Sequence, residues 1–107
     1  MSEDLIKPLQ GKVALVTGAA GTMGLAAVRV LLEDGCTVAL VDTHHERTLA
    51  IAESMGRNAL PFCFDISDPD AVREGHARIV AAVGAVDILV NNAGILSNNK
   101  VEATDAA

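Results

Sequence analysis

The stretch TGAAGTMG, residues 17–24, has the residue types and spacing of a turn that binds a phosphate group. It follows the apolar run VALV and opens onto a second apolar stretch, as a turn between a strand and a helix would. Glycine lets the backbone approach a pyrophosphate closely, and the amides and positive dipole end of the next helix hold the anion. Gly18 therefore permits the tight turn, and Gly24 lets the helix pack closely on the sheet.

The closest approach to a phosphate in such a turn falls to Gly21 and Thr22. Threonine stands where a glycine is usual, and it adds a β-branched side chain there. It also keeps a backbone amide and brings a hydroxyl, and either can donate to a phosphate oxygen. We therefore expect the turn to remain usable, with Met23 completing the contacts.

Asp42 is the second residue whose position predicts ligand binding. It ends the apolar run TVALVD, 24 residues after Gly18, near the ~20-residue spacing at which an acidic residue meets the adenosine ribose of a dinucleotide. A carboxylate accepts hydrogen bonds from both ribose hydroxyls, and its charge repels a 2′-phosphate. These properties favour NAD over NADP, while Arg47, one turn into the next helix, leaves NADP open.

Short apolar runs alternate with helix-length segments along the chain, and this alternation indicates the strands and helices that hold these residues. Continuous apolar runs are typical of strands buried on both faces. We predict a Rossmann-like, three-layer α/β fold with a parallel sheet in the order 3-2-1-4 and right-handed crossovers. Pro61 fits the third strand only at or near an edge, because proline cannot donate to the ladder. The strands are predicted at residues 12–17, 37–42, 59–64 and 86–91.

Three helices are predicted between the strands. The first spans 23–34 before Gly35, the second has Thr43 and Glu46 as a capping box, and the third starts with Pro69 at its first position. The residues expected to face the sheet are Leu25, Val28, Leu31 and Leu32 in the first helix, Leu49, Ala52 and Met55 in the second, and Val72, His76, Ile79, Val80 and Val83 in the third.

Composition narrows the class of protein. The chain has 107 residues, half of them apolar and only two aromatic, which fits one domain with an aliphatic core. A net charge of −6 without a basic cluster argues against nucleic acid or an anionic membrane as a partner. Cys36 and Cys63 are interpreted as reduced core thiols, and we assign no metal site. Since no run approaches the ~18 apolar residues of a membrane helix, a cytoplasmic protein is expected.

Three motifs together resemble the short-chain dehydrogenases/reductases: GKVALVTGAAGTMG, CFDIS and VDILVNNAG. The first is similar to the cofactor loop of that family, with threonine in place of its second glycine. The resemblance implies that Asp65 binds the adenine amino group and that Ile66 covers the adenine face. It also implies that Asn92, Ala93 and Gly94 line the cofactor beside the ribose.

The resemblance further implies an oxidoreductase that acts on an alcohol/carbonyl pair with NAD as hydride acceptor. The chemistry of that family needs a serine, a tyrosine and a lysine four positions after the tyrosine, and this chain contains no tyrosine. No catalytic residue is therefore assigned, and the chain alone is expected to be inactive. We interpret residues 1–107 as a partial NAD(P)-binding Rossmann domain, an incomplete doubly wound fold that would meet a small-molecule substrate only in a full-length form.

A second hypothesis belongs to another class, a noncatalytic nucleotide-binding or protein-interaction module. In the predicted order, the strand at 86–91 is an apolar edge without a neighbour on one side, and such an edge invites pairing with another chain. Either a homo-oligomer or edge-strand pairing with a different partner would follow from this hypothesis.

Overall fold

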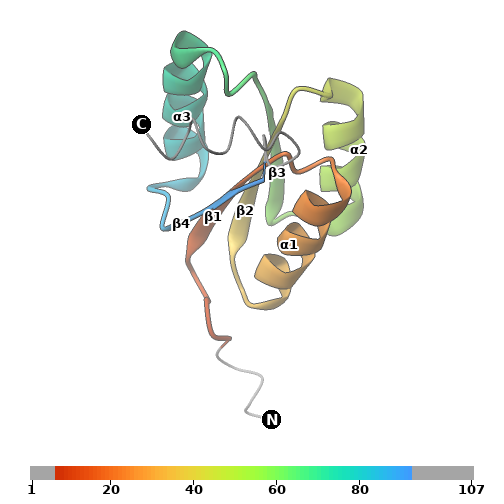
Figure 1. The fold of residues 1–107 in the computed structure, drawn as a ribbon. Helices are drawn as coiled ribbons and strands as arrows, with labels where there is room; N and C mark the ends of the chain where they lie inside the picture. The colour runs from red at the N-terminus through yellow and green to blue at the C-terminus, as the bar shows by residue number, and fades with distance from the viewer. Residues whose placement is uncertain (1–6, 93–107) are drawn as a thin grey trace.

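The computed structural model describes residues 7–92, and Ala93 and Gly94 of the predicted cofactor contacts lie outside this range. Strands and helices alternate along the chain, as the apolar runs predict (Figure 1). Their bounds are β1 Val13–Thr17, α1 Thr22–Glu33, β2 Thr37–Asp42, α2 His45–Met55, β3 Ala59–Cys63, α3 Pro69–Val83 and β4 Ile88–Asn91.

The strands form one parallel sheet in the order β3-β2-β1-β4, which confirms the predicted order. In the register, Leu15 of β1 lies between Ala39 of β2 and Leu89 of β4. Helices α1 and α2 cover one face of the sheet and α3 covers the other (Figure 1). The fold is thus the predicted three-layer Rossmann-like arrangement.

The core divides between the two faces of the sheet because successive side chains of a strand point to opposite faces. Val16 and Leu40 pack with Val28 of α1 in the larger cluster, on the face covered by two helices. Leu15 and Val41 belong to a smaller cluster with the third helix. Since β1 and most of β2 are buried on both faces, these two strands have continuous apolar sequences.

The two outer strands differ in how they end the sheet. Pro61 of β3 lies opposite Leu40 of β2. Among the described residues, β3 pairs with β2 alone, so the predicted edge position of this proline is confirmed. On the other side, β4 pairs with β1 alone within residues 7–92, and Leu89 is 63% exposed. An apolar groove of about 330 Å³ lies here, with Leu15, His76 and Leu89 in its lining.

The predicted start of α3 is confirmed, whereas that of α2 is wrong. Asp68 caps α3 by accepting from the N–H of Asp70 at 3.0 Å, with proline at the first helical position. The capping box from Thr43 does not form, because α2 begins at His45 after His44 and no side chain caps it. Instead, the carboxylate of Asp42, at the end of β2, accepts a hydrogen bond from the N–H of His44.

The predicted inner faces of α2 and α3 also need correction. Leu49 is 39% exposed, and Thr48 is buried in its place because its hydroxyl donates to the His44 carbonyl at 2.7 Å, so its polar group is satisfied. In α3, Gly75 and Ile79 are buried, whereas Val80 and His76 are exposed. In each of these helices, the buried face is therefore turned slightly from the face that the apolar residues predict.

Gly75 is buried because an aromatic ring occupies the space of its missing side chain. A Cβ atom at this position would come within 2.3 Å of Cε1 of Phe64, in the segment that follows β3. Glycine therefore allows α3 to lie directly against that ring.

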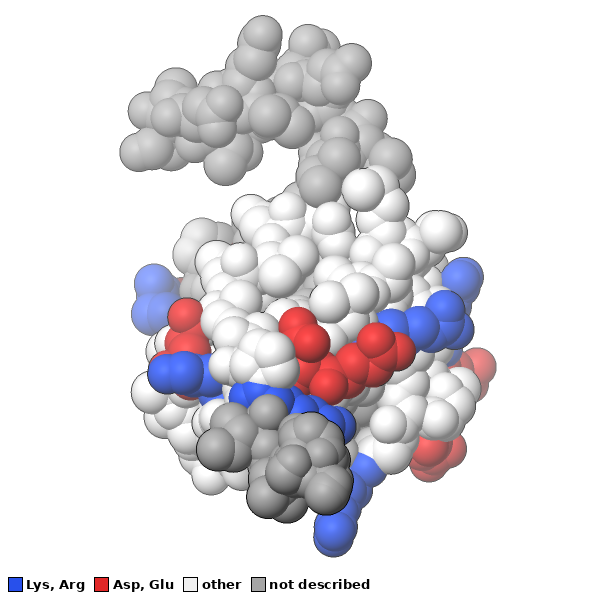
Figure 2. Space-filling model, turned by 90° about the horizontal axis from the view of Figure 1, so that it is seen from below, with Lys and Arg blue, Asp and Glu red and all other residues white. Residues whose placement is uncertain are grey.

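Charged side chains of both signs are interspersed on the face seen in Figure 2, where Lys and Arg do not gather into one patch. Within residues 7–92, no helix is both long and apolar enough to cross a membrane. In the same range, no cluster of three His, Cys, Asp or Glu side chains could hold a metal ion.

Candidate functional site

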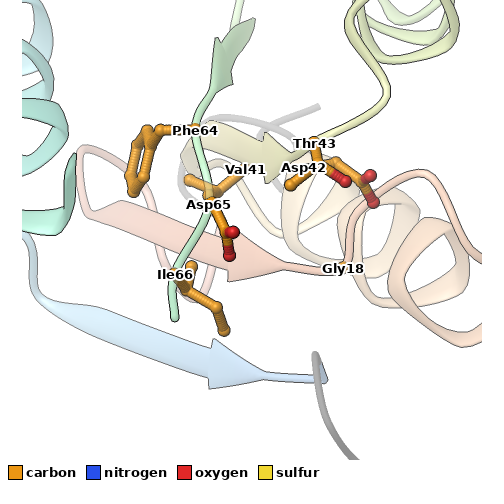
Figure 3. A pocket seen from close by; sticks show the side chains of 7 residues that line it. All are labelled: Gly18, Val41, Asp42, Thr43, Phe64, Asp65 and Ile66. Atoms are coloured by element: carbon orange, nitrogen blue, oxygen red, sulfur yellow. The ribbon is translucent and has the colours of Figure 1, made fainter. Parts of the chain in front are cut away.

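A cavity of about 170 Å³ opens where β1, β2 and β3 end (Figure 3). The carboxyl ends of parallel strands lie at the same edge of a sheet, and ligands of open α/β sheets bind at this edge. The structure brings four predicted site residues together here. The lining consists of Gly18, Val41, Asp42, Thr43, Phe64, Asp65 and Ile66.

The turn between β1 and α1 depends on glycine at two positions. Gly18 has φ +65°, a backbone conformation that favours glycine. A Cβ atom on Gly24 would lie 2.1 Å from the carbonyl oxygen of Gly18, so any other residue here would force the backbone to shift. Gly24 thus lets the first turn of α1 rest on the backbone of the loop, a closer contact than the helix-to-sheet packing predicted from the sequence.

The N-terminus of α1 presents its first residues outward. The helix begins at Thr22, its N-cap is Gly21, and no side chain caps it. The first backbone N–H groups of a helix have no acceptor within the helix. A Cβ on Gly21 would meet only the Gly18 oxygen, at 3.5 Å, and Met23 is 66% exposed. Thr22 is exposed as well, so the start of α1 is open to a ligand.

Asp42 joins the end of β2 to the glycine turn. Its Oδ2 accepts from the N–H of Ala20 at 3.0 Å, and its Oδ1 accepts from the N–H of His44, also at 3.0 Å. The Nδ1 atom of His44 lies 3.1 Å from the same Oδ1. Burial by itself would raise the pKa of Asp42, but these hydrogen bonds and the nearby imidazole lower it overall. The carboxylate is therefore held in its charged form beside the cavity.

Asp65 and Ile66 reach the cavity from the segment after β3 (Figure 3). The Oδ1 atom of Asp65 accepts from the N–H of Ser67 at 2.9 Å and from its hydroxyl at 2.7 Å. These two hydrogen bonds lower the pKa of Asp65. Ile66 is 37% exposed and gives this side of the cavity an apolar surface.

Asn92 lies at the end of β4, next to the end of β1. Its N–H donates to Oγ1 of Thr17 at 3.0 Å, and that hydroxyl donates to Oδ1 of Asn91 at 2.9 Å. The side-chain Nδ2 of Asn92 is buried and has no partner among the described residues. Asn92 thus ties the ends of β1 and β4 together, and it is not among the residues that line the cavity.

Two contacts in this site were not predicted from the sequence, those of Ala20 and His44 with Asp42. A histidine two residues after a strand-end aspartate is a signal that could have indicated the second contact. The first contact depends on the path of the glycine turn, which the sequence alone does not define.

The sequence model of the family described as short chain dehydrogenase matches residues 12–107, a span that includes every strand and helix described above. The chain belongs to the short-chain dehydrogenase family. Short-chain dehydrogenases are oxidoreductases that bind a nicotinamide dinucleotide, and the parallel sheet and glycine turn of this chain agree with that membership.

Several short-chain dehydrogenases of known name are similar to this chain. A 2,3-dihydro-2,3-dihydroxybenzoate dehydrogenase from Bacillus subtilis is 41% identical over 93 residues, covering 84% of this chain and 36% of that protein. The 3-oxoacyl-[acyl-carrier-protein] reductase FabG of Vibrio harveyi is 40% identical over 91 residues, covering 85% and 37%. (+)-Borneol dehydrogenase 1 of Salvia officinalis is 35% identical over 105 residues, covering 98% and 40%.

This chain therefore spans between 36% and 40% of the length of these three short-chain dehydrogenases. Their names describe three different substrates at similar levels of identity. The residues that this chain shares with them are accordingly common to the family and do not indicate one particular substrate.

Proposed function

We propose that this chain binds NAD at the carboxyl ends of β1, β2 and β3, as the cofactor-binding portion of a short-chain dehydrogenase that interconverts an alcohol and a carbonyl. One observation carries the proposal. The carboxylate of Asp42 lines the cavity in its charged form, and it is hydrogen-bonded to Ala20 of the glycine turn. A hydrogen bond thus links the carboxylate proposed to bind the ribose to the turn proposed to bind the phosphates.

The pyrophosphate of the dinucleotide would lie at the start of α1. The backbone amides of Thr22 and Met23, and the hydroxyl of Thr22, donate to its oxygens there, and the dipole of α1 favours its charge. Gly21 leaves the space through which the phosphates approach, since a Cβ there would point toward open surface apart from one contact at 3.5 Å.

The adenosine end would occupy the cavity itself. At about 170 Å³ the cavity is smaller than the roughly 300–1,000 Å³ of typical ligand pockets, so it suits one end of a dinucleotide. Asp42 accepts from the ribose hydroxyls, and its charge repels a 2′-phosphate. Asp65 accepts from the adenine amino group, and Ile66 packs against the face of the ring.

The other end of the cofactor would extend toward the end of β4, where Asn92 would line it beside the ribose; Ala93 and Gly94, proposed for the same role, lie outside the described residues. Bound NAD supplies the hydride acceptor for oxidation of an alcohol. The family's proton transfer is the task of a tyrosine, and since this sequence has none, we assign no residue of the chain to that step. The 107 residues are thus proposed to bind cofactor without turning over substrate.

Substitution of Asp42 tests this proposal. We expect Asp42→Ala to weaken NAD binding roughly tenfold to a hundredfold, because hydrogen bonds to a charged group contribute about 1.5–3 kcal/mol each, and to reduce the rejection of NADP. Dissociation constants for both dinucleotides, measured by isothermal titration calorimetry, give the answer. Asp70→Ala is the matched control, since Asp70 is an exposed acid on α3 that pairs with Arg73. Unchanged NAD affinity and unchanged NADP rejection in Asp42→Ala would show that the ribose assignment is wrong.

A second candidate function is protein interaction through β4, favoured by the exposed Leu89 and by the single neighbour of this strand within residues 7–92. Unpaired strand edges template pairing with another chain. If a second copy pairs there, light scattering should report a dimer at micromolar concentrations, and Leu89→Lys should return it to a monomer. A wild-type chain that stays monomeric at every concentration would remove this candidate.

A further inference from the structure

His44 contacts the carboxylate of Asp42, the group proposed to choose between the cofactors. Its Nδ1 lies 3.1 Å from Oδ1 of Asp42, and its backbone N–H donates to the same oxygen at 3.0 Å. The imidazole is largely in solvent, with 74% of the side chain exposed, whereas the Asp42 side chain is only 12% exposed. The histidine can therefore exchange protons with water while it contacts a mostly buried charge.

The hydrogen bonds already made by Asp42 leave limited room for a ribose. A carboxylate oxygen has about two acceptor positions. Oδ1 accepts from the N–H of His44 and, whenever Nδ1 carries a proton as in the imidazolium, from the ring as well, whereas Oδ2 retains one position beside the Ala20 amide. A ribose that uses both oxygens must displace the imidazole, so the strength with which His44 holds Oδ1 affects how well the site takes a free 2′-hydroxyl.

We propose that His44 makes the cofactor choice of this site depend on pH, so that protonation of its imidazole shifts the preference from NAD toward NADP. The inference rests on the proposed function, because it needs a dinucleotide in this cavity. A neutral imidazole leaves the charge of Asp42 to repel a 2′-phosphate. An imidazolium holds Oδ1 against the ribose hydroxyl, offsets the charge of Asp42, and offers a positive partner to the 2′-phosphate.

The other titratable groups at this corner do not produce the same effect. Hydrogen bonds lower the pKa of Asp42 and that of Asp65, so both carboxylates stay charged through the neutral and mildly acidic range. Burial raises the pKa of the Cys63 thiol of β3, which keeps it neutral there. The first turn of α2 adds His45, Glu46 and Arg47. Of these, Glu46 and Arg47 carry opposite charges, so their effects on the charge of the site offset each other.

His45 provides the matched control for this proposal. It is an exposed histidine directly after His44, and within the described residues its ring makes no hydrogen bond to Asp42. A general effect of an added positive charge near the site would therefore appear in both histidine variants, whereas an effect through Asp42 would appear in the His44 variants alone.

The test measures dissociation constants of NAD and NADP by isothermal titration calorimetry at about pH 8 and about pH 5.5, the range over which histidine ordinarily titrates. The proteins are the wild type, His44→Gln, His44→Arg and His45→Gln. The preference for NAD over NADP should fall roughly three- to tenfold on acidification in the wild type and in His45→Gln, an amount typical of a partly exposed ion pair. His44→Arg should show the reduced preference at both pH values.

The 2′-phosphate of NADP itself gains a proton near pH 6, and His44→Gln isolates that contribution. We expect a clearly smaller change of preference in His44→Gln than in the wild type. The same change in both would overturn the role of His44 while leaving the NAD assignment intact. Failure of every protein to bind either dinucleotide at both pH values would instead contradict the proposed function, and this inference with it.

Discussion

At the scale of single residues, the site depends on a carboxylate that serves the fold and the ligand together. Asp42 accepts from Ala20 of the glycine turn and from His44 at the start of α2. Its two oxygens thereby fix the relative positions of β2, the turn and the second helix. The proposed ribose contact would use the acceptor capacity that remains, so a change at this residue affects stability as well as binding.

Asp42 should also make stability depend on acid pH. Its pKa is lowered in the folded protein, so its contribution to the free energy of unfolding is fully present above the unfolded value, about 3.9, and is lost as pH falls from there through the folded pKa. We expect the stability of the wild type to fall more steeply below about pH 4 than that of Asp42→Asn. Urea unfolding between about pH 6 and pH 3 measures this difference. Parallel curves for the two proteins would mean that the carboxylate contributes nothing to the acid sensitivity.

The sequence predicts much of the site at this scale, because residue type and position along the chain already constrain it. Gly18, Asp42, Asp65 and Ile66 all follow apolar runs, and parallel strands bring such positions to one edge. The His44 contact could not be predicted in the same way. It arises because α2 begins only at His45, which places the backbone N–H and the ring of His44 against the carboxylate of Asp42, and an N-cap assigned to Thr43 does not predict that start.

At the scale of elements, the strands follow the sequence more closely than the helix faces do. Continuous apolar runs define β1 and β2 because both of their faces are buried. The helix faces are decided by particular contacts instead. Thr48 is buried because its hydroxyl has an acceptor one turn back, and Gly75 because a ring fills its place. Hydrophobic periodicity predicts neither of these two contacts.

The contact between Gly75 and Phe64 links helix packing to the cavity, since Phe64 also belongs to the cavity lining. We expect Gly75→Ala to lower the free energy of unfolding by about 1–3 kcal/mol, because the new methyl group overlaps the ring, and to weaken NAD binding by moving Phe64. The double variant Gly75→Ala with Phe64→Leu should lose less stability than the sum of the two single variants. Additive losses in urea unfolding would contradict the contact as described.

At the scale of the whole molecule, the sheet is covered unequally. Within residues 7–92, two helices pack on one face and α3 alone packs on the other, where an apolar groove runs beside β4. The relatives that match this chain are longer, and the chain spans 36–40% of the three described here. Fold and family follow from the sequence, because three ordered motifs and the strand order agree. The substrate does not follow, since the similar proteins differ in theirs.

We propose above all that a dinucleotide binds along the ends of β1, β2 and β3. The most direct measurement is an NMR titration of the isotope-labelled chain with NAD, following each backbone amide. We predict that the largest shifts fall on residues 18–24, 42–44 and 65–66, which are the turn, the end of β2 with the start of α2, and the proposed adenine side of the cavity. Shifts confined to other surfaces, or no shifts at millimolar NAD in a chain that gives a folded spectrum, would contradict it.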